Sequence, residues 1–131
     1  MLFKIISSDT LSNLLQKKRI LLIDLRSRDS YEISHIPGAA WMDWEQAEAD
    51  ITILSDSFHS SHGFYPDWIV LYCDAGNISL ITARDLARLG YPVMSLNGGF
   101  HRWNGAVTAK KEEGKEVEGK TEKGKTVEPK T

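Results

Sequence analysis

The residue with the most distinctive chemistry is Cys73, the single cysteine of the 131-residue chain. It follows the apolar run 68–72 and opens a turn of small residues, 74–77, after which Ser79 begins a stretch with helical periodicity. A thiol between a buried strand and a helix start faces converging backbone N–H groups, which favour the thiolate. One cysteine cannot form an intrachain disulfide, so we expect a reactive thiol. The alternative is a buried cysteine that packs as a small apolar residue.

The elements that must position this thiol alternate between strand-like and helix-like patterns. Continuous apolar runs at 20–23 and 68–72 are typical of strands buried on both faces. Shorter strands are predicted at 3–6, 39–42 and 93–96, and helical segments at 7–15, 28–33, 43–49, 79–89 and 100–103. The residues expected on the buried side of 79–89 are Leu80, Ala83, Leu86 and Ala87. Residues 51–66 show no readable pattern.

This alternation predicts an α/β fold with a mostly parallel sheet and helices on both faces. Ligands in such folds bind beyond the C-terminal ends of the strands, which is where Asp24-Leu25-Arg26 and Cys73 lie. The folded domain is expected to span 1–109. Residues 110–131 are rich in lysine and glutamate and poor in large apolar groups, so they are predicted to be a disordered mixed-charge tail.

Composition and charge narrow the class of protein. A hydrophobic content of 41% suits one domain, and no apolar stretch approaches the roughly 20 residues of a membrane-spanning helix. The start of the chain lacks a signal-peptide pattern and there is no disulfide framework, so a cytoplasmic location is expected. The net charge of -2 argues against a general polyanion-binding surface, so we expect neither nucleic acid nor membrane as a partner.

Four motifs, in order across about 1–106, resemble the rhodanese (sulfurtransferase) domain family. They are LIDLR at 22–26, YEISHIPGA at 31–39, VLYCDAGNIS at 70–79, and the pair GY at 90–91 with NGGFHRW at 97–103. The resemblance implies a five-stranded domain in which Cys73 is the catalytic nucleophile. It also implies a cradle of loop amides for the sulfur, supplied by Asp74, Ala75, Gly76, Asn77, Ile78 and Ser79. Gly76 suits such a loop because it reaches positive φ without strain.

The loop departs from the family pattern in its charge. Many members carry an arginine where this chain has Ile78, and Asp74 adds a negative charge beside the thiol. Anionic donors such as thiosulfate should therefore be disfavoured. Cysteine phosphatases share the fold class, but they need an arginine six residues after the cysteine to clamp phosphate, and Ser79 stands there. A phosphatase is therefore not expected.

Three residues outside the loop are expected to support the site. Asp24 and Arg26 should pair or cap locally, with Arg26 at the border of the pocket, and His35 should have a structural hydrogen-bonding role rather than a role in proton transfer. The other histidines have irregular spacing and form no metal-ligand pattern with Cys73. We therefore expect no metal and no cofactor.

Two functions remain open. In the first, the chain is a sulfurtransferase: Cys73 takes sulfane sulfur from thiosulfate, polysulfide or a persulfide, holds it as a persulfide, and passes it to a thiol or cyanide. In the second, it is a non-enzymatic sulfur carrier or regulatory module that binds a protein partner. The intact cysteine favours the first function, whereas Ile78 and Asp74 favour the second or an unusual donor.

Overall fold

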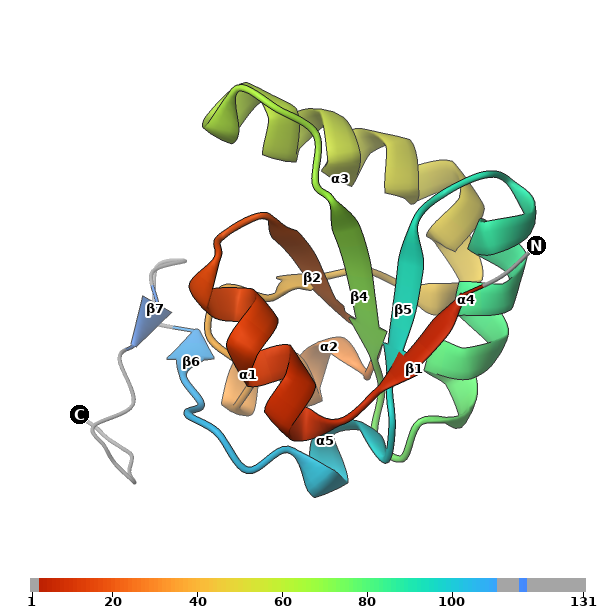
Figure 1. Ribbon diagram of the computed structural model, residues 1–131. Helices are drawn as coiled ribbons and strands as arrows, with labels where there is room; N and C mark the ends of the chain where they lie inside the picture. The colour runs from red at the N-terminus through yellow and green to blue at the C-terminus, as the bar shows by residue number, and fades with distance from the viewer. Residues whose placement is uncertain (1–2, 111–115, 118–131) are drawn as a thin grey trace.

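Two apolar runs form the centre of a five-stranded parallel sheet, as predicted. The computed structural model describes residues 3–110 and 116–117 (Figure 1). Its sheet has the order β1-β5-β4-β2-β3, with β4 paired to β2 on one side and β5 on the other. The strands are β1 (Lys4–Ile6), β2 (Ile20–Asp24), β3 (Ala40–Trp41), β4 (Trp68–Tyr72) and β5 (Val93–Leu96). The C-terminal ends of β1, β2, β4 and β5 point toward the bottom of Figure 1.

Helices cover both faces of the sheet, which confirms the predicted fold class. They are α1 (Ser8–Gln16), α2 (Arg28–Ile33), the 3₁₀ turn η1 (Trp44–Gln46), α3 (Ala47–His62), α4 (Asn77–Arg88) and α5 (Gly99–Arg102). Alternate strand residues face opposite ways: Ile69 and Leu71 pack with α3 and α4, and Val70 and Tyr72 pack with α1 and α5. Because helices cover both faces, both alternating sets of side chains are buried, which explains why the runs 20–23 and 68–72 are apolar throughout.

Helix α3 fills most of the segment that showed no pattern in the sequence. It runs to His62 and ends at Gly63, whose φ of 85° lies in the left-handed region. Its buried side includes Ile51 and Phe58 but also the hydroxyl-bearing Ser55. A polar residue on the buried side weakens the helical hydrophobic period, and this is why the segment could not be read.

The predicted buried side of α4 was wrong at Leu80, which is 37% exposed. The helix is turned so that Ser79 and Thr82 face the sheet together with Ala83 and Leu86. The buried side of α4 therefore includes two polar residues, Ser79 and Thr82, which a pattern of apolar residues does not identify.

A short antiparallel pair, β6 (Ala109–Lys110) with β7 (Glu116–Val117), lies at the start of the segment predicted to be a disordered tail. Residues 111–115 and 118–131 of that segment lie outside the described residues, so its disorder stays a prediction. Within the described part of the chain, no helix has the length and apolar character needed to cross a bilayer.

Candidate active site

The loop after β4 is shaped by Gly76. This residue is the N-cap of α4 and has a φ of 105°, a conformation that L side chains rarely adopt. A Cβ at this position would also lie 3.2 Å from the backbone nitrogen of Gly98. The tight turn brings the first turn of α4 back over Cys73, which directly follows β4.

Backbone amides surround the sulfur of Cys73. The N–H of Gly76 donates to Sγ over 3.2 Å, and the N–H of Ser79 donates over 3.3 Å. The Ser79 hydroxyl lies 3.6 Å from Sγ, and the thiol is almost completely buried. Of the six loop residues predicted to form the cradle, these two supply the amide contacts that reach the sulfur. Such donors stabilise negative charge on sulfur.

A second serine holds the Ser79 hydroxyl in place. The hydroxyls of Ser79 and Ser95 lie 2.8 Å apart, and Ser79 also donates to the carbonyl of Gly76 over 3.3 Å. Ser95 sits in the middle of β5 and is 1% exposed. Sequence reasoning missed Ser95, although a hydroxyl inside an otherwise apolar strand was a visible signal of a specific partner.

The glycine pair at the start of α5, Gly98 and Gly99, holds the back of the loop. The carbonyls of Cys73 and Asp74 accept hydrogen bonds from the N–H groups of Phe100 (2.8 Å) and His101 (3.0 Å). This close approach needs glycine: a Cβ on Gly99 would lie 2.3 Å from the Cys73 carbonyl oxygen. The loop carbonyls are thus turned toward α5, and N–H groups are left to face the thiol.

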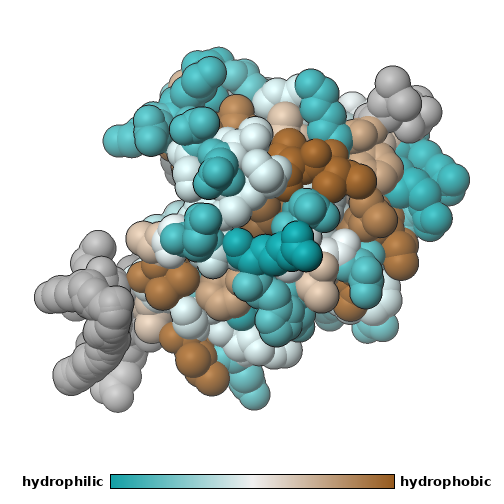
Figure 2. Space-filling model, turned by 60° about the horizontal axis from the view of Figure 1, so that its bottom comes forward, coloured by the Kyte–Doolittle hydropathy of each residue, from teal (hydrophilic) through white to brown (hydrophobic). Residues whose placement is uncertain are grey.

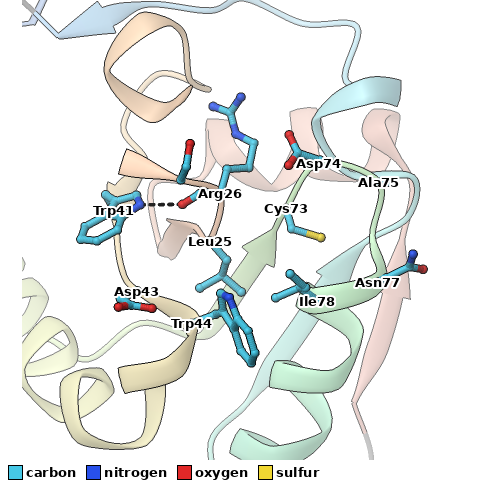
Figure 3. Close-up of a pocket in the computed structure, with 11 residues that line it drawn as sticks. Leu25, Arg26, Trp41, Asp43, Trp44, Cys73, Asp74, Ala75, Asn77 and Ile78 are labelled. Carbon is cyan, nitrogen blue, oxygen red and sulfur yellow. Dashed lines mark hydrogen bonds between the residues drawn. The ribbon is translucent and has the colours of Figure 1, made fainter. Parts of the chain in front are cut away.

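The thiol opens onto a pocket of about 500 Å³ (Figure 3). One side comes from the predicted loop and the other from the segments after β2 and β3. The lining residues are Leu25, Arg26, Ser27, Trp41, Asp43, Trp44, Cys73, Asp74, Ala75, Asn77 and Ile78. Figure 2, turned so that this end of the molecule comes forward, shows hydrophobic and hydrophilic surface intermixed there.

The tryptophan wall of this pocket was not predicted. In the sequence, Trp41 fell within the predicted strand 39–42, and Asp43 and Trp44 began the predicted helical segment 43–49. In the structure the Asp43 side chain accepts a hydrogen bond from the N–H of Glu45 and caps η1, and the cap places Trp44 at the pocket mouth. The Trp41 ring is fixed because its Nε1–H donates to the carbonyl of Arg26 over 2.7 Å.

Arg26 borders the pocket, but its guanidinium is engaged elsewhere. Nε and Nη2 donate to the carboxylate of Asp24 at 2.8–3.1 Å, and Nη2 also donates to the carbonyl of Ser34. The guanidinium carbon lies 4.0 Å from the centre of the Phe100 ring. Burial opposes the charged form, but the hydrogen bonds and the charge of Asp24 outweigh it and raise the pKa of Arg26. The expected pairing of these two residues is present, and it is buried.

His35 lies away from the pocket and inside the fold. Its side chain is fully buried, Nδ1 lies 2.7 Å from the carbonyl oxygen of Tyr31, and the two rings stack at 3.9 Å. Its backbone N–H and C=O both pair with Thr108. This geometry fits the expected structural role.

Comparison with known proteins gives a consistent assignment. The rhodanese-like domain family matches residues 7–106. The thiosulfate sulfurtransferase GlpE of Pseudoalteromonas translucida is 30% identical over 113 residues, which cover 86% of this chain and 99% of that protein. The adenylyltransferase and sulfurtransferase UBA4 of Candida albicans is 32% identical over 82% of this chain. The match covers 25% of UBA4, so this chain corresponds to only a part of that relative.

Solved structures with a similar fold support the same family. A thiosulfate sulfurtransferase from Pseudomonas aeruginosa superposes with a TM-score of 0.65 at 25% identity, over 78% of this chain and 18% of that one. The BH2092 protein from Bacillus halodurans gives a TM-score of 0.64 at 26% identity, over 82% of this chain and 77% of that one. The fold and the motif-bearing residues therefore point to the same family.

Proposed function

Because the chain belongs to the rhodanese-like domain family, we propose that it is a sulfurtransferase that carries sulfur as a persulfide on Cys73. One observation carries this proposal: the sulfur of Cys73 accepts two backbone N–H groups, at 3.2 and 3.3 Å, and lines an open pocket. A nucleophile needs both features, since the donors stabilise negative charge on sulfur during transfer and the pocket admits a sulfur compound.

The reaction has two displacements. In the first, the Cys73 thiolate attacks the sulfane sulfur of a donor. A bond forms between Sγ and that sulfur, the bond to the rest of the donor breaks, and the leaving group takes the electron pair. In the second, an acceptor thiolate or cyanide attacks the outer sulfur, and the electron pair of the broken S–S bond returns to Cys73. The amides of Gly76 and Ser79 meet negative charge on the sulfur at both stages.

Donor choice should follow the charge of the loop. Ile78 lines the pocket where an arginine would meet an anion, and Asp74 places a carboxylate beside the thiol. A donor with less negative charge, such as the persulfide of an uncharged or cationic thiol, should therefore load Cys73 better than thiosulfate does.

Loading can be tested by intact mass. The protein is incubated with thiosulfate, polysulfide or glutathione persulfide, desalted, and examined for the gain of one sulfur atom that dithiothreitol removes. We expect the gain with at least one donor in the wild type and its absence in Cys73→Ser. A wild-type protein that gains no sulfur from any of the three donors would refute the proposal.

The second candidate is a sulfur carrier or regulatory module with poor turnover, which Ile78 and Asp74 favour. It shares the loading step with the enzyme. The two separate in the second step, because a carrier loses its sulfur to small thiols or cyanide only at the slow rate of an uncatalysed persulfide and discharges rapidly only to a protein. Repeated turnover with cyanide or a small thiol therefore favours the enzyme.

A further inference from the structure

The pocket beside Cys73 is much larger than a small inorganic donor requires. Its volume of about 500 Å³ falls within the range of sites that hold organic ligands. Its walls are largely apolar: Leu25 and Ile78 lie beside the Trp44 ring in Figure 3, with Trp41 on the far side of Asp43. A pocket of this shape suits a substrate with an apolar body.

Trp44 offers the ring that such a body would contact. It is 42% exposed at the pocket mouth. The Trp41 ring, in contrast, is held by its hydrogen bond to the carbonyl of Arg26, and the guanidinium carbon of Arg28 lies 5.4 Å from the ring centre. An open indole face attracts flat apolar groups and cations.

The charge of the pocket is negative. Among the residues that the structure describes, its charged lining side chains are Arg26, Asp43 and Asp74. The guanidinium of Arg26 is neutralised by the buried carboxylate of Asp24, so the two remaining carboxylates set the sign. In Figure 3, Asp43 lies between the two tryptophans, across the pocket from Cys73. A positive group on the substrate would meet this carboxylate while its sulfur reaches the thiol.

We propose that the sulfur acceptor is an organic thiol with an apolar body and a positive charge, of the aminothiol class, and that Asp43 and Trp44 select it. This inference rests on the proposed function, since it names the acceptor of the same site. The acceptor thiolate forms a bond to the outer sulfur of the Cys73 persulfide. The S–S bond of that persulfide breaks, its electron pair stays on Sγ as a thiolate, and the outer sulfur leaves with its proton as the acceptor's hydropersulfide.

Matched acceptors can test this choice. Three phenylethanethiols are used, with an aminomethyl, a methyl or a carboxylate group at the para position, so that the charge lies far from the sulfur. Protein loaded with polysulfide is mixed with each thiol at low ionic strength, and loss of the extra sulfur is followed by intact mass. We expect the amine to discharge the protein about tenfold faster than the carboxylate, with the methyl compound between them and the ratio falling in salt.

Variants locate the effect. Asp43→Asn should reduce the ratio of amine to carboxylate rates several-fold, and asparagine can still cap η1. Asp56→Asn is the control: it also removes one carboxylate but lies on α3 beside Tyr65, near the opposite end of β4, and should leave the ratio unchanged. Trp44→Ala should slow all three aromatic thiols but not 2-mercaptoethanol, which is too small to need the ring.

A binding measurement separates this inference from the proposed function. Cys73→Ser protein is titrated with 4-methylbenzylamine and with 4-methylbenzoate, and the tryptophan Nε1–H signals are followed by NMR. We expect the amine to bind more tightly and Asp43→Asn to remove the difference. Equal rates for the three thiols, or equal binding of the two analogues, would overturn the inference. If Cys73 never gains sulfur while the amine still binds more tightly than the carboxylate, the proposed function is wrong. The inference that the pocket prefers cationic apolar ligands is then still supported.

Discussion

Replacing Ile78 with arginine tests how loop charge sets the choice of donor. Ile78 lies in the first turn of α4, lines the pocket, and packs at its inner end against the core. An arginine there would extend its guanidinium into a pocket whose uncompensated charges are those of Asp43 and Asp74. Thiosulfate is a dianion, so Ile78→Arg should improve its use.

The magnitude follows from the exposure of the site. One partly exposed charge partner is worth about 1 kcal/mol, which is about fivefold in affinity. The double charge of thiosulfate and the partial enclosure of the pocket should increase this gain in affinity. The attraction of the new guanidinium to the carboxylates of Asp43 and Asp74 should reduce it. We therefore expect roughly a five- to thirtyfold gain in kcat/KM for thiosulfate, mainly through KM and shrinking with salt. Loss of Ile78 packing should cost about 1 kcal/mol of stability.

The assay is sulfur transfer from thiosulfate to cyanide, measured at low ionic strength with melting temperature as a check on folding. Ile78→Gln is the matched control, because glutamine is long and polar but uncharged, and Ile78→Glu reverses the charge. The expected order of kcat/KM is Arg above Gln above Glu. If the arginine and glutamine variants use thiosulfate equally well at low salt, loop charge does not set donor preference.

Three further variants test the frame around the thiol. Gly99→Ala should destabilise the protein by a few kcal/mol and slow sulfur loading sharply, because its Cβ would lie 2.3 Å from the Cys73 carbonyl oxygen. Gly38→Ala is the control: Gly38 also has a positive φ, but a Cβ there would have no atom within 4 Å, so urea unfolding should show a cost of only about 1 kcal/mol. Asp24→Asn leaves the buried Arg26 charge without its counter-ion and should cost about 3–5 kcal/mol of unfolding free energy, and a loss below 1 kcal/mol would show that the pair is dispensable. Ser95→Ala removes the 2.8 Å contact to Ser79 and should cost about 1 kcal/mol and slow loading several-fold; unchanged loading would mean that the Ser79 hydroxyl needs no support.

The thiol loop was predictable because its determinants are adjacent in sequence. A buried strand, a small-residue turn and a helix start within 68–79 favour the convergence of N–H groups, and the contacts from α5 then hold the loop in that conformation. The parallel pairing of strands in an alternating α/β chain is similarly constrained, and the family resemblance added the number of strands. The pairing of Asp24 with Arg26, two residues apart at a strand end, belongs to the same local class.

What the sequence did not reveal depends on contacts between distant segments. Ser95 reaches Ser79 across 16 positions, and Trp44 meets the loop only because η1 is capped by Asp43 and lies beside α4. Neither contact produces a repeating pattern of hydrophobic residues that could be recognised in the sequence. Helix α3 was missed for a different reason, because the buried Ser55 interrupts the hydrophobic period of its helix.

The most direct test of the account follows one labelled sulfur atom through Cys73. The protein is loaded with a donor whose sulfane sulfur is isotopically labelled, freed of donor, and mixed with acceptor in a rapid-quench experiment. We predict that the Cys73-containing peptide loses the label at the rate at which the acceptor gains it, at least as fast as steady-state turnover, and that Cys73→Ser transfers none. Label that reaches the acceptor in Cys73→Ser protein, or a loaded Cys73 that discharges more slowly than turnover, would contradict it.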